Sequence, residues 1–183
     1  MKRYLAFIPN ILSMLRLGLA FFFPFCPEHL WILLILGSGA SDFLDGWCAR
    51  RWKTTSWQGG LLDAVADKTF MFVALTTVAM TGKFSIWWIP AVIARDLTVG
   101  IAAGYAALIR SWDSFRNMGA RWPGKLATAG QFLLLITVVL LPGMTPAVLF
   151  ITVLCSAIAA GDYGLLFLQA LRQQHTDKKA SAR

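Results

Sequence analysis

The feature of this 183-residue sequence that most constrains its fold is a series of six apolar stretches, each about as long as a membrane-spanning helix. They cover residues 9–25, 29–52, 59–81, 85–110, 122–141 and 146–171. A transmembrane helix needs about 20 predominantly apolar residues. With 57% hydrophobic and only 14% charged residues, the chain is too apolar for one small water-soluble core. The sequence therefore predicts an all-α membrane protein with six transmembrane helices.

Positive charge is distributed unevenly among the connections between these stretches. Lys and Arg cluster at the N-terminus, in the loops 50–58 and 110–122, and in the C-terminal tail, whereas the other turns carry only Lys83. Cytoplasmic segments of membrane proteins are enriched in Lys and Arg. We therefore expect cytoplasmic termini, one transmembrane domain over residues 1–172 and a disordered basic cytoplasmic tail over 173–183. The net charge of +8 then reflects membrane topology, and no nucleic acid partner is expected.

Four aspartates lie inside the second and third apolar stretches. Asp42 and Asp45 are three residues apart, and Asp63 and Asp67 are four apart, so each pair occupies one helix face. An Asp at the centre of a membrane helix costs about 2.5–3.5 kcal/mol. Because a short loop joins the two helices, we expect an antiparallel hairpin. Both pairs would then meet about 6–8 Å below the cytoplasmic boundary.

Converging carboxylates without His or Cys form a hard oxygen site, which suits Mg²⁺ or Mn²⁺, and two such ions would neutralise the charge. One alternative is structural pairing with basic residues. We expect it to fail on supply, because only Arg16, Lys68 and Arg95 lie deep in the apolar stretches. Asp96 is moreover the natural partner of Arg95. A second alternative is a divalent-cation channel or transporter, which explains the aspartates but not their neighbours.

Those neighbours are small or basic. Gly46 and Ala49 permit close approach of a substrate or of another helix. Arg50 follows Asp42 by two helical turns, which places it to bind a phosphate. With Gly59, the segment reads D-x2-D-G-x2-A-R-x8-G-x3-D-x3-D.

This string, DFLDGWCAR…GLLDAVAD, resembles the signature of the CDP-alcohol phosphatidyltransferase family at every fixed position. PNILSMLR in the first helix and GKLATAGQ in the fifth are similar to further motifs of that family. The resemblance implies a six-helix, homodimeric enzyme of a cell inner membrane or its mitochondrial equivalent. Such an enzyme transfers phosphatidyl from CDP-diacylglycerol to an alcohol acceptor and releases CMP, at a site that faces the cytoplasm.

The resemblance also implies roles for individual residues. The metal ligands would be Asp42, Asp45, Asp63 and Asp67, and Asp67 would also be the catalytic base. The residues implied to bind the CDP-lipid are Asn10, Ser13, Gly46, Arg50 and Ser56. We expect direct displacement, because no Ser, Cys or His is placed as a nucleophile, although a ping-pong mechanism stays open.

The acceptor is less clearly indicated. Arg95 and Lys125 would line a pocket for an anionic acceptor, unless Arg95 simply pairs with Asp96. PNILSMLRLGLA and GK-x2-T-x2-Q resemble the glycerol-lipid branch of the family. Its acceptors are glycerol 3-phosphate, in phosphatidylglycerophosphate synthases, or phosphatidylglycerol, in CMP-forming cardiolipin synthases. The Arg95-Asp96 pair departs from the Arg-Glu common in the former, and ARDLTVGIAAGYAALIR resembles the CMP-forming cardiolipin synthases more closely. The resemblance therefore puts glycerol 3-phosphate in doubt without excluding it, and both acceptors stay open. No role is assigned to Asp162.

Overall fold

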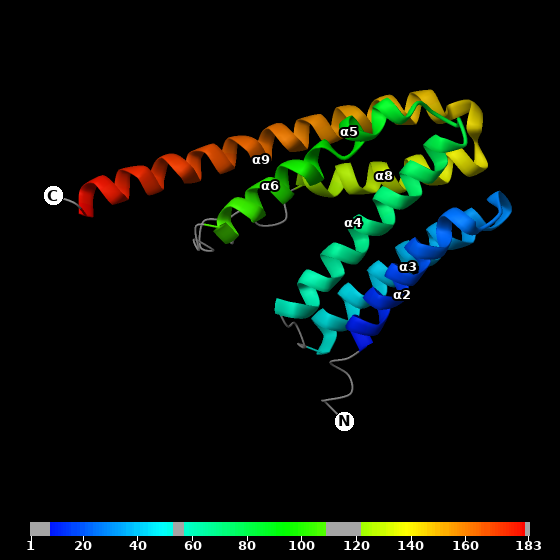
Figure 1. Cartoon of the computed structure of the whole chain (residues 1–183), viewed down its shortest axis with the longest axis horizontal. Helices are drawn as coiled ribbons and strands as arrows, with labels where there is room; N and C mark the ends of the chain where they lie inside the picture. Colours follow the sequence, from blue (N-terminus) through cyan, green and yellow to red (C-terminus); the bar gives the residue numbers. More distant parts are fainter. Residues whose placement is uncertain (1–7, 53–56, 109–121, 182–183) are drawn as a thin grey trace. The chain divides into compact units, whose positions relative to one another are not determined.

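The computed structural model describes residues 8–52, 57–108 and 122–181. All regular structure in these ranges is helical, which confirms the predicted all-α class (Figure 1). The chain divides into two compact units, which we describe separately. The first comprises Met1–Ile86 and Phe132–Pro146, and the second comprises Trp87–Gln131 and Ala147–Arg183.

The first unit is built mainly from the first three helices of the described chain. Its elements are α2 (Ile8–Phe22), η1 (Phe23–Phe25), α3 (Glu28–Trp52), α4 (Trp57–Met80), the end of α8 (Trp122–Leu140) and η3 (Pro142–Met144). Pro24 and Pro27 separate α2 from α3, because proline lacks the N–H that a continuing helix needs. The helices predicted from the first three apolar stretches are confirmed to within a few residues.

Packing in this unit centres on α2. Among the residues that the structure describes, α2 packs extensively against both α3 and α4, and α3 and α4 contact each other less. The expected meeting of α3 and α4 is therefore accompanied by a third helix, α2, which packs against both. Faces that carry aspartates repel each other, and α2 brings a basic side chain between them, as described below.

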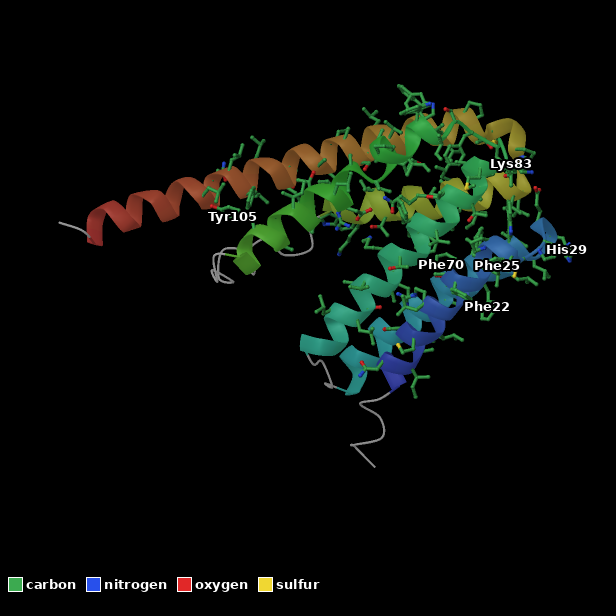
Figure 2. All side chains as sticks on the ribbon, in the orientation of Figure 1. Phe22, Phe25, His29, Phe70, Lys83 and Tyr105 are labelled. Carbon is green, nitrogen blue, oxygen red and sulfur yellow. The ribbon has the colours of Figure 1, made fainter. Side chains whose placement is uncertain are left out.

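The apolar core of this unit is aromatic at the end where η1 lies. Phe23 is fully buried, stacks on Trp31 with ring centroids 5.5 Å apart, and meets Phe70 edge-on at 5.8 Å. Phe22 and Phe25, which flank Phe23 in the sequence, are exposed (Figure 2). Such exposed aromatic side chains suit a protein whose outer surface faces lipid.

The second unit contains a broken helix. Its main elements are α5 (Ile89–Val92), α6 (Ala94–Leu108), the first part of α8 and most of α9 (Thr145–Ser181); η2 (Ile86–Trp88) precedes α5. We expected one continuous span over 85–110. The structure instead bends by 55° between the segments Ile86–Val92 and Ala94–Tyr105.

Side chains of neighbouring helices satisfy the backbone at this break. Gln131 Nε2 donates to the carbonyl oxygen of Val92 at 3.0 Å. The backbone N–H of Arg95 donates to Ser156 Oγ at 3.2 Å. Irregular backbone is tolerated at membrane depth only where protein groups satisfy it, so these two side chains stabilise the break.

Helix α9 is longer than the apolar stretch from which we predicted it. It continues to Ser181, so the expectation of a disordered tail is wrong for residues 173–181, and residues 182–183 lie outside the described part. The extension over 172–181 contains no Gly or Pro, and its Ala, Arg, Gln and Lys residues have high helix propensity.

Apolar helices in the described part are long enough to cross a membrane. Trp122–Leu140 and Pro142–Gln169 qualify by length and composition, and the bent pair makes a third if it is counted as one span. Helices α3 and α4 have 25 and 24 residues, which is sufficient length, but they carry the aspartates. The protein is therefore an all-helical membrane protein.

Candidate active site

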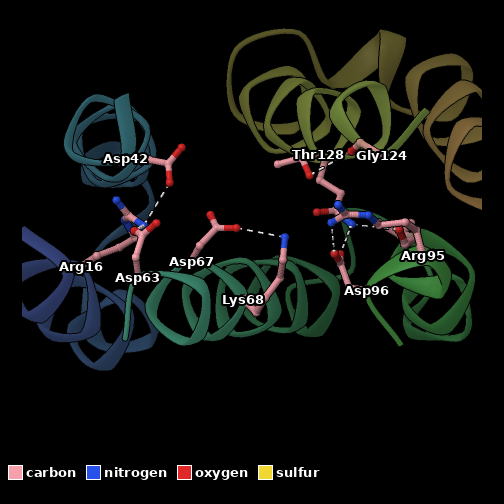
Figure 3. Close-up of polar contacts among 11 residues, drawn as sticks. Arg16, Asp42, Asp63, Asp67, Lys68, Arg95, Asp96, Gly124 and Thr128 are labelled. Atoms are coloured by element: carbon pink, nitrogen blue, oxygen red, sulfur yellow. Dashed lines mark hydrogen bonds and ion pairs between the residues drawn. The ribbon is translucent and has the colours of Figure 1, made fainter. Parts of the chain in front are cut away.

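Asp42 of α3 and Asp63 of α4 meet at one nitrogen of Arg16. Arg16 Nη1 lies 3.1 Å from Asp42 Oδ1 and 3.0 Å from Asp63 Oδ1 (Figure 3). The Arg16 side chain is fully buried, while 44% of Asp42 and 40% of Asp63 remain exposed. The expected convergence of carboxylates from the two helices is therefore seen for this pair.

The position of Arg16 follows from the pattern of α2. Asn10, Ser13 and Arg16 recur every three residues, which places them on one helix face. Ser13 and Arg16 are both buried. Arg16 Nε donates to Ser41 Oγ at 3.2 Å, and the Ser41 hydroxyl donates to the carbonyl oxygen of Ser38 at 2.9 Å. The guanidinium is thus fixed by the residue next to Asp42.

Asp67 lies one helical turn after Asp63 on α4 and is buried. Its Oδ2 pairs with Lys68 Nζ at 2.9 Å (Figure 3). Its Oδ1 is buried and has no hydrogen-bond partner within the described residues. A buried carboxylate oxygen without a partner is costly, so this atom marks a place where a cation or a proton belongs.

Basic residues do pair with the aspartates, which corrects our expectation that their supply is too small. Arg16 contacts two carboxylates and Lys68 contacts a third. In the described part of the site, three carboxylates lie beside the two cations Arg16 and Lys68, and Asp67 Oδ1 has no hydrogen-bond partner among the described side chains. This hard oxygen donor set fits a divalent cation such as Mg²⁺. Within the described residues, however, no three acidic, His or Cys side chains form a ready-made metal cage.

Several predicted site residues fall outside what the structure describes. The side chains of Asp45, Gly46 and Arg50 on α3 are not among those described, and Ser56 lies in the segment 53–56. Asn10 is half-buried on α2. The roles of these five residues stay predictions.

A second polar cluster occupies the second unit. Arg95 Nη1 donates to Asp96 Oδ1 at 2.8 Å, and Asp96 Oδ2 accepts from Gln131 Nε2 at 2.8 Å (Figure 3). The Arg95 guanidinium carbon also lies 5.4 Å from the centroid of the Tyr163 ring. The pairing that we considered as the structural alternative is therefore present. Arg95 Nε is buried and finds no hydrogen-bond partner in the described ranges.

Gly124 makes room for this cluster. A Cβ atom at this position would lie 2.9 Å from both Arg95 Nη2 and Tyr163 Oη, closer than real Cβ contacts allow. Lys125, the next residue, is exposed, and its ammonium lies 5.4 Å from the Trp122 ring centroid. Gly124 rather than Lys125 thus faces Arg95. The GKLATAGQ motif contained this signal, but nothing in the sequence pointed to Tyr163.

The family comparison decides what kind of protein carries these clusters. The family model described as CDP-alcohol phosphatidyltransferase matches residues 6–159. The chain belongs to the CDP-alcohol phosphatidyltransferase family. The match contains the motif from Asp42 to Asp67 as well as Arg16, Arg95 and Gly124. The resemblance that we inferred from the motif is confirmed.

Curated relatives agree with the family match. Three of them are named CDP-diacylglycerol--glycerol-3-phosphate 3-phosphatidyltransferase. The protein of Sodalis glossinidius is 37% identical over 146 residues, which is 74% of this chain and 78% of the relative. The protein of Pectobacterium atrosepticum is 35% identical over 70% of this chain and 74% of its own. That of Yersinia enterocolitica is 34% identical over 68% and 71%.

The aspartates alone fit either an enzyme or a divalent-cation channel. Membership of this family decides in favour of the enzyme. The chain is a phosphatidyltransferase. The aspartates therefore lie in an enzyme that acts on a phosphate-containing lipid, for which carboxylates that hold cations are the expected machinery.

Proposed function

We propose that the protein transfers the phosphatidyl group of CDP-diacylglycerol to glycerol 3-phosphate and releases CMP. The observation that carries this proposal is the set of relatives named for this reaction, which match over more than two thirds of both chains. Arg95, in the polar cluster of the second unit, supports an anionic acceptor, because a guanidinium binds phosphate through charge-assisted hydrogen bonds.

Asp42, Asp45, Asp63 and Asp67 are the proposed ligands of Mg²⁺ or Mn²⁺, with two ions bound. The excess of carboxylates over cations and the unpartnered Asp67 oxygen within the described residues support this assignment. When bound, divalent ions polarise the diphosphate and stabilise the charge on the departing CMP.

Asp67 is the proposed general base. As the hydroxyl oxygen of the acceptor attacks the β-phosphorus, its proton passes to Asp67, for which the buried Oδ1 is available. The new bond joins the acceptor oxygen to the β-phosphorus, and the bond from that phosphorus to the bridging oxygen of CMP breaks. The transfer is one direct displacement.

Arg95 is the proposed ligand of the acceptor phosphate. Asp96 and Gln131 orient its guanidinium, and the close approach at Gly124 keeps it beside Tyr163. Lys125, which we first considered as a second ligand, is dispensable in this proposal because its ammonium lies over Trp122. The proposed contacts of the CDP moiety are Asn10, Ser13, Gly46, Arg50 and Ser56.

The proposed setting is a homodimer in the bacterial inner membrane. Each chain would cross the membrane six times as one domain over residues 1–172, with cytoplasmic termini and the site open to the cytoplasm. The unequal distribution of Lys and Arg between the connections supports this orientation.

The test offers purified protein CDP-diacylglycerol and Mg²⁺ with either glycerol 3-phosphate or phosphatidylglycerol. Lipid mass spectrometry and CMP release are the readouts. We expect phosphatidylglycerol phosphate from glycerol 3-phosphate and no cardiolipin from phosphatidylglycerol. Cardiolipin as the sole product would reject the proposed acceptor, and the absence of CMP with both acceptors would reject the proposed reaction.

A further inference from the structure

Arg16 is a buried, charged side chain that lies between two carboxylates. The side chain comes from α2, is fully buried, and reaches carboxylates of two other helices through one nitrogen, at 3.1 Å and 3.0 Å. Burial of a charge is expensive unless partners compensate it. The compensation here comes from Asp42 and Asp63, which we propose as metal ligands, so Arg16 lies among the ligands themselves.

The geometry resembles that of a bridging cation. Two carboxylate oxygens that approach a common point repel each other unless a positive charge lies between them. Arg16 Nη1 is that charge, and Ser41 Oγ, 3.2 Å from Nε, holds the guanidinium in place. A divalent ion bound by the same two carboxylates would be a second positive charge close to Arg16.

We propose that Arg16 is a tethered counter-cation of the carboxylate site. It holds Asp42 and Asp63 together when no divalent ion is bound, and it competes with the incoming ion for their oxygens. This inference rests on the proposed function, because it takes the two aspartates as metal ligands. Arg16 is thus a positioning residue whose charge lowers the affinity of the site for metal.

This role differs from a purely structural one in the sign of its effects. If Arg16 only supports the fold, its removal lowers both the stability of the metal-free protein and the affinity for metal. If Arg16 is a counter-cation, its removal lowers the stability of the metal-free protein but raises metal affinity. The second effect follows because like charges repel.

The experiment compares wild-type protein with Arg16→Met, Arg16→Lys and Ser38→Ala, each as the full chain in detergent. Met removes the charge at similar length, and Lys keeps the charge without the planar fork. Ser38 is the matched control, because its hydroxyl is fully buried on α3 and has no partner in the described part of the chain. Electron paramagnetic resonance measures Mn²⁺ binding without substrate, and thermal unfolding is followed in EDTA and in saturating Mn²⁺.

We expect Arg16→Met to bind Mn²⁺ at least about tenfold more tightly than wild type, because it removes one repelling charge. It should unfold at a lower temperature in EDTA, and saturating Mn²⁺ should remove most of that difference. Arg16→Lys should bind Mn²⁺ with nearly wild-type affinity, and Ser38→Ala should match wild type in both measurements.

Equal or weaker Mn²⁺ binding by Arg16→Met overturns the counter-cation role. A variant that folds only in Mn²⁺ supports it, whereas one that folds in neither buffer overturns it, because the metal then cannot replace the guanidinium. Wild-type protein that binds no Mn²⁺ would reject the metal site of the proposed function, and this role with it. That failure is recognised in the wild type alone, before any variant is compared.

Discussion

Arg16 on α2 and Asp63 on α4 are 47 residues apart in the chain, and 3.0 Å separates Arg16 Nη1 from Asp63 Oδ1. This contact and the matching one to Asp42 connect α2 with both aspartate-bearing helices, α3 and α4. The two carboxylates repel each other, and the Arg16 guanidinium on α2 reduces this repulsion because it lies between them.

Replacement of Asp67 by Asn should lower the rate of CMP release about 100-fold to 10,000-fold, the usual effect of losing a general base. The amide keeps the size of the side chain but cannot accept the proton. CMP release at saturating substrates is the measurement.

Glu28→Gln is the matched control for the Asp67 variant. Glu28 begins α3, and its carboxylate pairs with Lys83 at 2.8 Å, with more than half of the side chain exposed. Its activity should equal that of wild type. Retained activity in Asp67→Asn would remove the base assignment.

Gly124→Ala should raise the KM for glycerol 3-phosphate about tenfold while the KM for CDP-diacylglycerol changes little. The new Cβ would lie 2.9 Å from Arg95 Nη2 and from Tyr163 Oη, so the guanidinium must move. Steady-state kinetics with each substrate varied in turn measures the effect.

Gly100→Ala is the control for this substitution. Gly100 lies on α6, where a Cβ meets nothing within 4 Å, and alanine favours the helix. Its kinetics should be unchanged. An unaltered KM for glycerol 3-phosphate in Gly124→Ala would argue against Arg95 as the acceptor ligand.

Gln131→Leu should destabilise the protein by about 1–3 kcal/mol, the usual cost of removing one partner of a buried hydrogen bond. The variant loses the donor to the Val92 carbonyl at the helix break and to Asp96 Oδ2. Thermal unfolding in detergent measures the loss.

Thr128→Ala tests whether the effect at position 131 is specific. The Thr128 hydroxyl donates within its own helix, to the carbonyl oxygen of Gly124 at 3.3 Å. Its removal should change stability by less than about 0.5 kcal/mol. Similar unfolding temperatures for the two variants would show that Gln131 does not stabilise the break.

Chelation by EDTA should abolish CMP release, and added Mg²⁺ or Mn²⁺ should restore it. The physical reason is the buried Asp67 Oδ1, which has no hydrogen-bond partner within the described residues and is a hard oxygen donor. In the control, the same ions are added to protein that was not treated with EDTA and already holds saturating metal. Its rate of CMP release should not increase. Full activity in EDTA would exclude the proposed metal site.

Helix positions were predictable from the sequence because they depend on local properties. Apolar length, Pro24 and Pro27, and the absence of breakers after Gly164 are all visible in the chain. The break between α5 and α6 had one local signal, Pro90, three residues before Ile93. Its position was not predictable, because the residues that stabilise it, Gln131 and Ser156, come from distant helices.

The sequence by itself determined the chemistry of this protein: an apolar chain, acidic residues at helical spacing and a family signature from Asp42 to Asp67. Only the tertiary structure decided which side chains meet, namely Arg16 with Asp42 and Asp63, and Gly124 with Arg95. The reason is that spacing along one helix defines a face, whereas contact between helices depends on which faces pack together.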